Sequence, residues 1–188
     1  MSRLLLQFLN APVIILAALW VVAIESSLFT FQPIRNLQPE LVILLVLWFG
    51  LKRSFIEGGI LTLIVGEIAE ANSGAPQGVL ILAYVSAFLA IRSLSRVLVF
   101  PDFARAGPLA FLLCVSQRII VSGIMFLLGV QMIQWEQIVF YWIPGAAATS
   151  ILSIPIYRWL ARWDWITFKD ERARQALEDE LQLEGEGL

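Results

Sequence analysis

The stretch PELVILLVLWFGLKRSFIEGGILTLIVGEIAEA, residues 39–71, decides how many times this chain is expected to cross a membrane. It contains two apolar runs, Pro39–Leu51 and Ser54–Ala71, separated by Lys52 and Arg53. A membrane-spanning helix needs about 20 mostly apolar residues, with a range of roughly 17–25. The first run is short and the second is adequate, so the segment forms either two helices or one interrupted helix.

Four further apolar runs accompany this stretch, and they cover Ala11–Phe31, Val79–Phe100, Gly107–Gly129 and Ile138–Leu160. The 188 residues are 59% hydrophobic and 15% charged, whereas soluble domains are about 45–50% apolar. A soluble fold of this size would have too little polar surface to cover it. The sequence therefore predicts an all-α integral membrane protein.

The basic residues favour six spans over five. With six spans and a cytoplasmic N-terminus, eleven Lys and Arg residues are cytoplasmic, Arg35 alone is outside, and Arg118 lies within a span. Merging the two runs of residues 39–71 would export most of these charges, against the positive-inside rule. We therefore predict a compact bundle of six transmembrane helices over residues 1–165, with both ends of the chain in the cytoplasm.

Residues 166–188 differ in composition from the apolar part. From Asp164 to Leu188 there are eight acids and three bases. Apolar residues between Lys169 and Leu183 recur at near-helical spacing, which predicts an acidic, partly helical cytoplasmic tail. Both a solvated terminus and a helix that docks on a partner remain open.

Histidine is absent and Cys114 is the only cysteine. This excludes a Ser-His-Asp triad, an HExxH zinc site and an internal disulfide. An intramembrane hydrolase is not favoured either, because Ser122 has no histidine partner. We expect no catalytic site, no metal site and no cofactor.

Among the ionisable residues of the apolar runs, we single out Glu25, Glu67 and Arg118 for their depth in the expected spans. Each costs roughly 2.5–3.5 kcal/mol at mid-span on insertion scales. Glu25 lies deeper than Glu67, and Arg118 is near the middle of its run, so we predict a Glu25–Arg118 ion pair. The pair would fix helix register or line a substrate or proton pathway; the two groups could also fail to meet.

Glu67 and Glu70 are three residues apart and so project from one face of a helix, near its outer end. A solvated helix end is favoured over a cation site, because no third ligand accompanies them. The segment that follows holds Gly74, Pro76 and Gly78, which predict a tight turn.

Small residues recur in the third and sixth runs. The third holds Gly58, Gly59 and Gly66, and the sixth holds Gly145 and Thr149 four residues apart. In lipid, small residues at this spacing let helix backbones approach closely. We expect helix-packing interfaces at these positions, either within the bundle or with a partner protein.

Features between Leu37 and Leu98 together resemble MreD, the membrane subunit of the bacterial cell-elongation machinery. They are Pro39-Glu40-Leu41 and Trp48 in the second run, Gly58, Gly59, Gly66 and Glu67 in the third, then Ser73-Gly74, Gly78 and Tyr84. Pro155-Ile156-Tyr157-Arg158 is also similar to the family's C-terminal end. The family commonly has Asp at the position of Glu67 and often Gln at that of Glu25.

This resemblance implies a non-catalytic scaffold in the bacterial cytoplasmic (inner) membrane. Such proteins bind MreC, a single-span protein that connects to the wall-synthesising transpeptidase and glycosyltransferase, while MreB filaments lie on the cytoplasmic side. The implied function is to maintain rod shape through the organisation of peptidoglycan synthesis.

The alternative is a small-molecule transporter. The expected bundle is similar in architecture to the substrate-binding subunits of energy-coupling-factor vitamin transporters. Those usually carry an Ala-x-x-x-Ala motif in the first span, whereas here Ala17 is followed four residues later by Val21. In that reading Glu25, Glu67 and Arg118 would line an outward-facing pocket.

Overall fold

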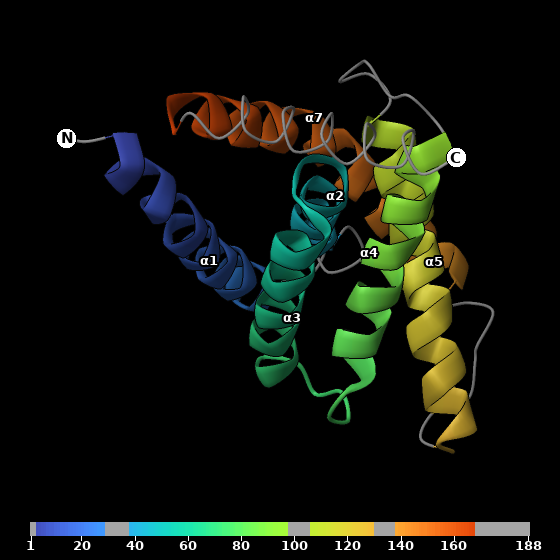
Figure 1. The fold of residues 1–188 in the computed structure, drawn as a ribbon. Coiled ribbons are helices and arrows are strands. Elements are labelled where there is room, and N and C mark those ends of the chain that lie inside the picture. Colours follow the sequence, from blue (N-terminus) through green and yellow to red (C-terminus); the bar gives the residue numbers. More distant parts are fainter. Residues whose placement is uncertain (1–2, 29–37, 98–105, 130–137, 168–188) are drawn as a thin grey trace, which may run out of the picture.

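The computed structural model describes residues 3–28, 38–97, 106–129 and 138–167 (Figure 1). These residues form helices and no strand, so the all-α prediction is confirmed for this part of the chain. The elements are α1 (Arg3–Leu28), α2 (Leu41–Lys52), α3 (Phe55–Ala71), α4 (Val79–Val97), α5 (Ala106–Leu127), the π-helical turn η3 (Ile138–Trp142) and α7 (Ile143–Ile166). Of the predicted acidic tail, residues 166–188, all but the first two residues lie outside the described part of the chain.

Helix α2 is the centre of the bundle. Every residue from Val42 to Gly50 is buried, and α2 contacts α1, α3, α4, α5 and α7. A helix that is apolar on all sides packs stably only where protein or lipid surrounds it completely. Here the surroundings are other helices, and Trp48 meets Tyr157 of α7 edge-to-face with ring centroids 4.6 Å apart.

The length of α2 corrects the expectation of a full second span. Its 12 residues rise about 18 Å, well short of the roughly 30 Å hydrocarbon core. Gln38–Glu40, which precede it, are not helical. The predicted run thus combines a non-helical entry with a short helix.

The break between α2 and α3 lies where the basic pair predicts it. Arg53 is extended, with φ −107° and ψ 156°. Ser54 then caps α3, because its side chain accepts a hydrogen bond from the Glu57 N–H at 3.3 Å. The two-helix interpretation of residues 39–71 is confirmed.

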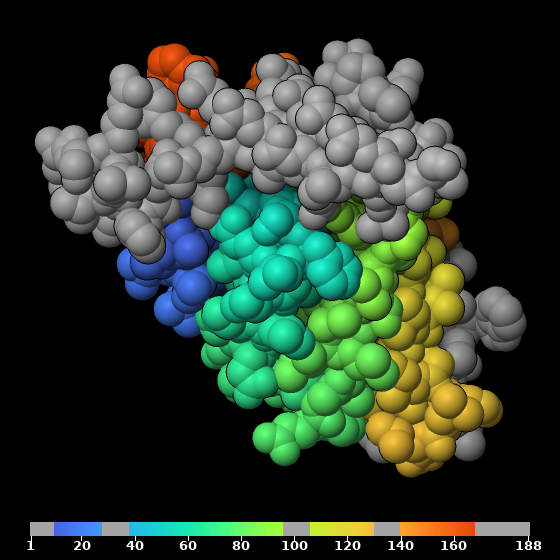
Figure 2. All heavy atoms as spheres, viewed as in Figure 1, coloured from blue at the N-terminus to red at the C-terminus, as the bar shows by residue number. Residues whose placement is uncertain are grey.

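Helices α3, α4 and α5 lie side by side on one face of the bundle (Figure 2). The tight turn expected between α3 and α4 is present, and Gly78 has φ +89° there. That backbone conformation is accessible mainly to glycine. Pro76 contributes a carbonyl that accepts the Val79 N–H at 3.3 Å, and Gly74 has open space around it.

The start of α1, the α2–α3 junction and the end of α7 meet at one end of the bundle, the upper end in Figure 1. The α3–α4 turn and the end of α5 lie at the opposite end. The first described helix therefore begins at the same end of the bundle where the last one finishes.

Among the helices that the structure describes, two are long and apolar enough to cross a membrane: α1 over Asn10–Ser27 and α5 over Ala106–Leu127. Large apolar side chains are exposed on the outside of the bundle as well. Among them are Trp20 at 72%, Ile56 at 73% and Ile151 at 71% exposed. Exposed apolar surface of this kind is typical of a protein that contacts lipid or a partner.

Candidate functional site

The entry to α2 collects polar groups from four parts of the chain, which we call the α2-start cluster: Glu25, Gln38, Glu40, Arg118 and Thr149. The Glu40 N–H donates to the Thr149 hydroxyl at 2.9 Å. The Leu41 N–H donates to the Glu25 carboxylate. The first N–H groups of a helix have no partner within it, so Glu25 and Thr149 satisfy backbone groups at the start of α2.

Arg118 ties together two stretches that are not α-helical. Its Nε donates to Glu40 Oε1 at 2.6 Å, its Nη1 to the Tyr141 carbonyl at 2.8 Å and its Nη2 to the Gln38 carbonyl at 3.4 Å. Gln38 belongs to the non-helical entry and Tyr141 to η3. Backbone carbonyls outside regular helices need other hydrogen-bond partners, and the Arg118 guanidinium donates to one carbonyl in each stretch.

The predicted Glu25–Arg118 ion pair is corrected by this geometry, because the carboxylate that pairs with Arg118 is that of Glu40. The physical reason is the non-helical entry. It carries Glu40 into the bundle to the level of Arg118, nine residues or about 14 Å before the end of α5. Glu25 instead meets the first N–H of α2.

Gly145 and Thr149 lie at an internal interface between α7 and its neighbours. A Cβ on Gly145 would lie 2.7 Å from the Gln38 carbonyl oxygen and 2.8 Å from Arg118 Nη2. Thr149 is fully buried, and its Oγ1 lies 3.9 Å from Cys114 Sγ. Gly145 and Thr149 therefore pack against other parts of the same chain.

A double-mutant cycle should separate the two possible partners of Arg118. We expect Arg118→Gln and Glu40→Gln to show a coupling free energy above about 1 kcal/mol, because they share a hydrogen-bonded ion pair. Arg118→Gln and Glu25→Gln should be additive within roughly 0.5 kcal/mol. Unfolding in detergent measures both; a larger coupling with Glu25 than with Glu40 would contradict the geometry.

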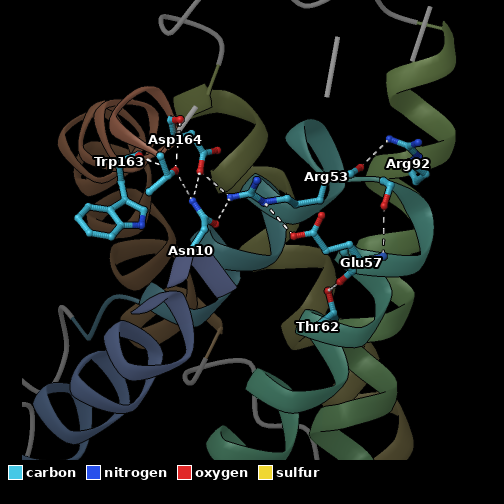
Figure 3. A network of polar contacts seen from close by, with 10 residues as sticks. Asn10, Arg53, Glu57, Thr62, Arg92, Trp163 and Asp164 are labelled. Atoms are coloured by element: carbon cyan, nitrogen blue, oxygen red, sulfur yellow. Dashed lines mark hydrogen bonds and ion pairs between the residues drawn. The ribbon is translucent and has the colours of Figure 1, made fainter. Parts of the chain in front are cut away.

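The other end of α2 carries a second group of buried polar residues, the α2-end cluster: Asn10, Arg53, Asp164 and Thr167 (Figure 3). Arg53 Nη2 contacts Asp164 Oδ1 at 2.5 Å and Asn10 Oδ1 at 2.8 Å. Asn10 Nδ2 donates to Asp164 Oδ1 at 3.1 Å and to Thr167 Oγ1 at 2.6 Å. The cluster joins α1, the α2–α3 junction and the end of α7.

Two further charged side chains approach Arg53 from α3 and α4. Glu57 lies 4.0 Å from its Nε, and Arg92 Nη1 donates to the Arg53 carbonyl at 3.2 Å (Figure 3). The sequence analysis places Arg53 among the cytoplasmic charges and counts Asp164 with the acids of the C-terminal segment, and it does not predict their contact. Two features of the sequence could have indicated this buried cluster. One is Asn10, an amide beside an apolar run, and the other is Asp164, an acid flanked by Trp163 and Trp165.

Gly58 and Gly66 face the interior and not a partner protein. A Cβ on Gly58 would lie 2.8 Å from the Phe88 ring and 3.0 Å from the Phe49 carbonyl oxygen. At Gly66 the nearest atoms, from Ile81 and Tyr84, lie at ordinary contact distances. Gly59 is half-buried, with only Phe88 within 4 Å. The described chain itself thus uses Gly58 and Gly66 for internal packing.

Glu67 and Glu70 have different environments despite their spacing. Glu67 is exposed, as a solvated helix end would be. Glu70 is buried, and its carboxylate accepts hydrogen bonds from the N–H groups of Gly78 at 2.5 Å, Leu80 at 3.0 Å and Ile81 at 3.2 Å. It therefore caps the start of α4 from the preceding helix, and the two acids do not form a joint site.

We expect Glu70→Gln to destabilise the bundle by about 1–2 kcal/mol, because the amide nitrogen would face N–H donors. Glu67→Gln is the matched control on the same helix and should change stability by less than about 0.5 kcal/mol. Unfolding titrations of the two variants compare them directly. Equal losses would show that the cap carries no special stability.

Within residues 3–28, 38–97, 106–129 and 138–167, no group of three or more Cys, Asp or Glu side chains is arranged to hold a metal ion. Cys114, which is buried, lies in the wall of the α2-start cluster. In this geometry the α2-start cluster holds α2 in place.

Comparisons of the chain with protein-family models, curated proteins and solved structures find no match.

Proposed function

We propose that this chain is a non-catalytic, multi-span scaffold of the bacterial cytoplasmic membrane. The observation that carries the proposal is that the guanidinium groups of Arg53 and Arg118 bind to other parts of the same chain. Arg118 is bonded to Glu40 and to two backbone carbonyls, and Arg53 is bonded to Asp164 and Asn10. Both guanidinium groups hold helices in place, which is what a rigid docking platform requires.

In this proposal all six helices lie in the membrane. The apolar α1 and α5 and the exposed apolar surface of the bundle support it. The meeting of the first and last described helices at one end supports an even number of crossings. A reporter fused after Leu188 should therefore be active only in the cytoplasm, and periplasmic activity would overturn this topology.

Within that class, the resemblance to MreD supports a role in the cell-elongation complex. The partner would be an MreC-like single-span protein, with indirect links to MreB filaments and to the wall-synthesising transpeptidase and glycosyltransferase. The scaffold would help to maintain rod shape through peptidoglycan synthesis. Gly58 and Gly66 are buried inside the chain, so the partner would use the exposed apolar faces and not these glycines.

Co-purification in mild detergent tests the proposed function. We expect the full chain to retain a single-span protein with a periplasmic coiled coil. Retention of an ATPase pair instead would overturn the scaffold and favour the transporter. Ile60 is exposed on α3. If a stable, folded Ile60→Arg variant fails to support cell elongation while Glu67→Gln supports it, the partner binds the exposed face of α3.

The second candidate is the substrate-binding subunit of a small-molecule transporter. One observation favours it: Glu40 Oε2 and Gln117 Oε1 are buried acceptor atoms without a hydrogen-bond partner among the described residues. Such atoms are found where a ligand or water completes the bonding. A solute that co-purifies stoichiometrically with the chain, and is lost in Gln117→Leu, would favour this function over the scaffold.

A further inference from the structure

The last turns of α7 carry a basic hollow on their outer surface. The hollow has a volume of about 420 Å³ and is lined by Arg158, Ala161, Arg162 and Trp165. These positions follow i, i+3, i+4 and i+7 spacing, so they share one face of the helix. Arg158, Arg162 and Trp165 are exposed, and Ala161 leaves room between them.

The positive charge of the hollow is not neutralised by its nearest acid. Asp164 is on the same helix, but its side chain is buried and bonded to Arg53 and Asn10. Neither Arg158 nor Arg162 has an ion-pair partner among the residues that the structure describes. Two guanidinium groups one turn apart favour a phosphate, which accepts hydrogen bonds from both.

An apolar stripe leads into the hollow along the same helix. Ile151 is 71% exposed and Ile154 is 38% exposed, and they precede Arg158 by seven and four residues. Seven residues of helix correspond to about 10 Å. The surface therefore runs from apolar to cationic and ends at the exposed indole of Trp165, a residue type enriched where membranes meet water.

We propose that this surface binds an anionic phospholipid, with the phosphate between Arg158 and Arg162 and an acyl chain along Ile151 and Ile154. The order of apolar and cationic groups matches the two parts of such a lipid. A free phosphate would use the arginines but not the isoleucines. The proposal rests on the membrane embedding of the proposed function and is independent of the protein partner.

The test uses the full chain purified in dodecyl maltoside, with thermal unfolding as the readout. Dioleoylphosphatidylglycerol should raise the unfolding temperature in a saturable way, whereas dioleoylphosphatidylcholine should have a much smaller effect. In Arg158→Gln/Arg162→Gln the half-maximal lipid concentration should rise at least about tenfold. Lys52→Gln, which removes an exposed charge from the same end of the bundle, should respond as the wild type does.

Three results would overturn the proposal. The first is an equal lipid response in the double arginine variant. The second is a full response to inorganic phosphate alone, which would assign the hollow to a free anion. The third is a lipid response that appears only in Glu178→Gln/Asp179→Asn/Glu180→Gln, which would assign the hollow to the acidic tail of the chain itself. Since both arginines are exposed, the double variant is expected to fold, and its unfolding temperature without lipid checks this.

Discussion

Arg53→Gln is expected to lower the stability of the bundle by about 3–5 kcal/mol, the loss typical of breaking a buried ion pair by removing one partner. The substitution leaves the Asp164 carboxylate buried without its cation and Asn10 Oδ1 without its donor. Unfolding in mixed micelles measures the loss. Lys52→Gln, which removes the adjacent but exposed charge, should change stability by less than about 0.5 kcal/mol.

A second variant tests the reason for that loss. In Arg53→Gln/Asp164→Asn the uncompensated carboxylate is also removed, so part of the lost stability should return. We expect the double variant to be more stable than Arg53→Gln alone by at least about 1 kcal/mol. If the double variant is no more stable, or if Lys52→Gln is as damaging as Arg53→Gln, the cluster does not hold the helices together.

Gly58→Leu is expected to abolish the folded monomer. The new side chain would enter a space bounded by the Phe88 ring at 2.8 Å and the Phe49 carbonyl at 3.0 Å from its Cβ. Both phenylalanines are buried, at 2% and 0% exposed, so neither can move outward easily. Size-exclusion chromatography after detergent extraction should show aggregate or no protein.

The adjacent glycine is the matched control for this prediction. Gly58→Ala should destabilise by about 1–3 kcal/mol through overpacking. Gly59→Ala has no neighbour closer than 3.8 Å and should be neutral or stabilising by up to about 1 kcal/mol, because alanine favours helix over glycine. A reversed order of the two alanine variants would show that α3 packs on α4 through another face.

The sequence was sufficient to predict where most helices begin and end. The basic pair at residues 52–53 breaks the apolar run, and the predicted starts of α3 and α4 agree with the structure to within one residue. These positions are readable because charge, a serine cap or a glycine turn interrupts the hydrophobic pattern locally. Helix packing through small residues was predictable for the same reason, since Gly58, Gly145 and Thr149 stand out in apolar runs.

The partners of the buried charges were not predictable from their depth. Depth was counted from the ends of the apolar runs, which assumes that each run is one regular helix. The non-helical Gln38–Glu40 violates this assumption and places Glu40 beside Arg118. The short length of the run after Pro39 was the available sign, because a run of 13 residues is too short for the regular spanning helix from whose ends depth was counted.

Glu70 illustrates the same limit at a smaller scale. The i, i+3 spacing of Glu67 and Glu70 correctly places both acids near the end of α3, but spacing within one helix contains no information about the next one. The turn through Gly78 brings the start of α4 back onto Glu70, whose carboxylate then accepts three backbone N–H groups. Only the three-dimensional path of the turn shows that Glu70 caps α4 while Glu67 is exposed to solvent.

The contacts of the α2-end cluster also fix an order of events during synthesis. Arg53 leaves the ribosome 111 residues before Asp164, and Asn10 precedes Asp164 by 154 residues. At translation rates of roughly 5–20 residues per second, Arg53 waits roughly 6–22 s for its counter-ion. Until α7 emerges, the contacts of the Arg53 guanidinium that are already available are those with Asn10 and Glu57, and its most deeply buried carboxylate partner is missing. The last of the described helices to be made therefore completes this cluster.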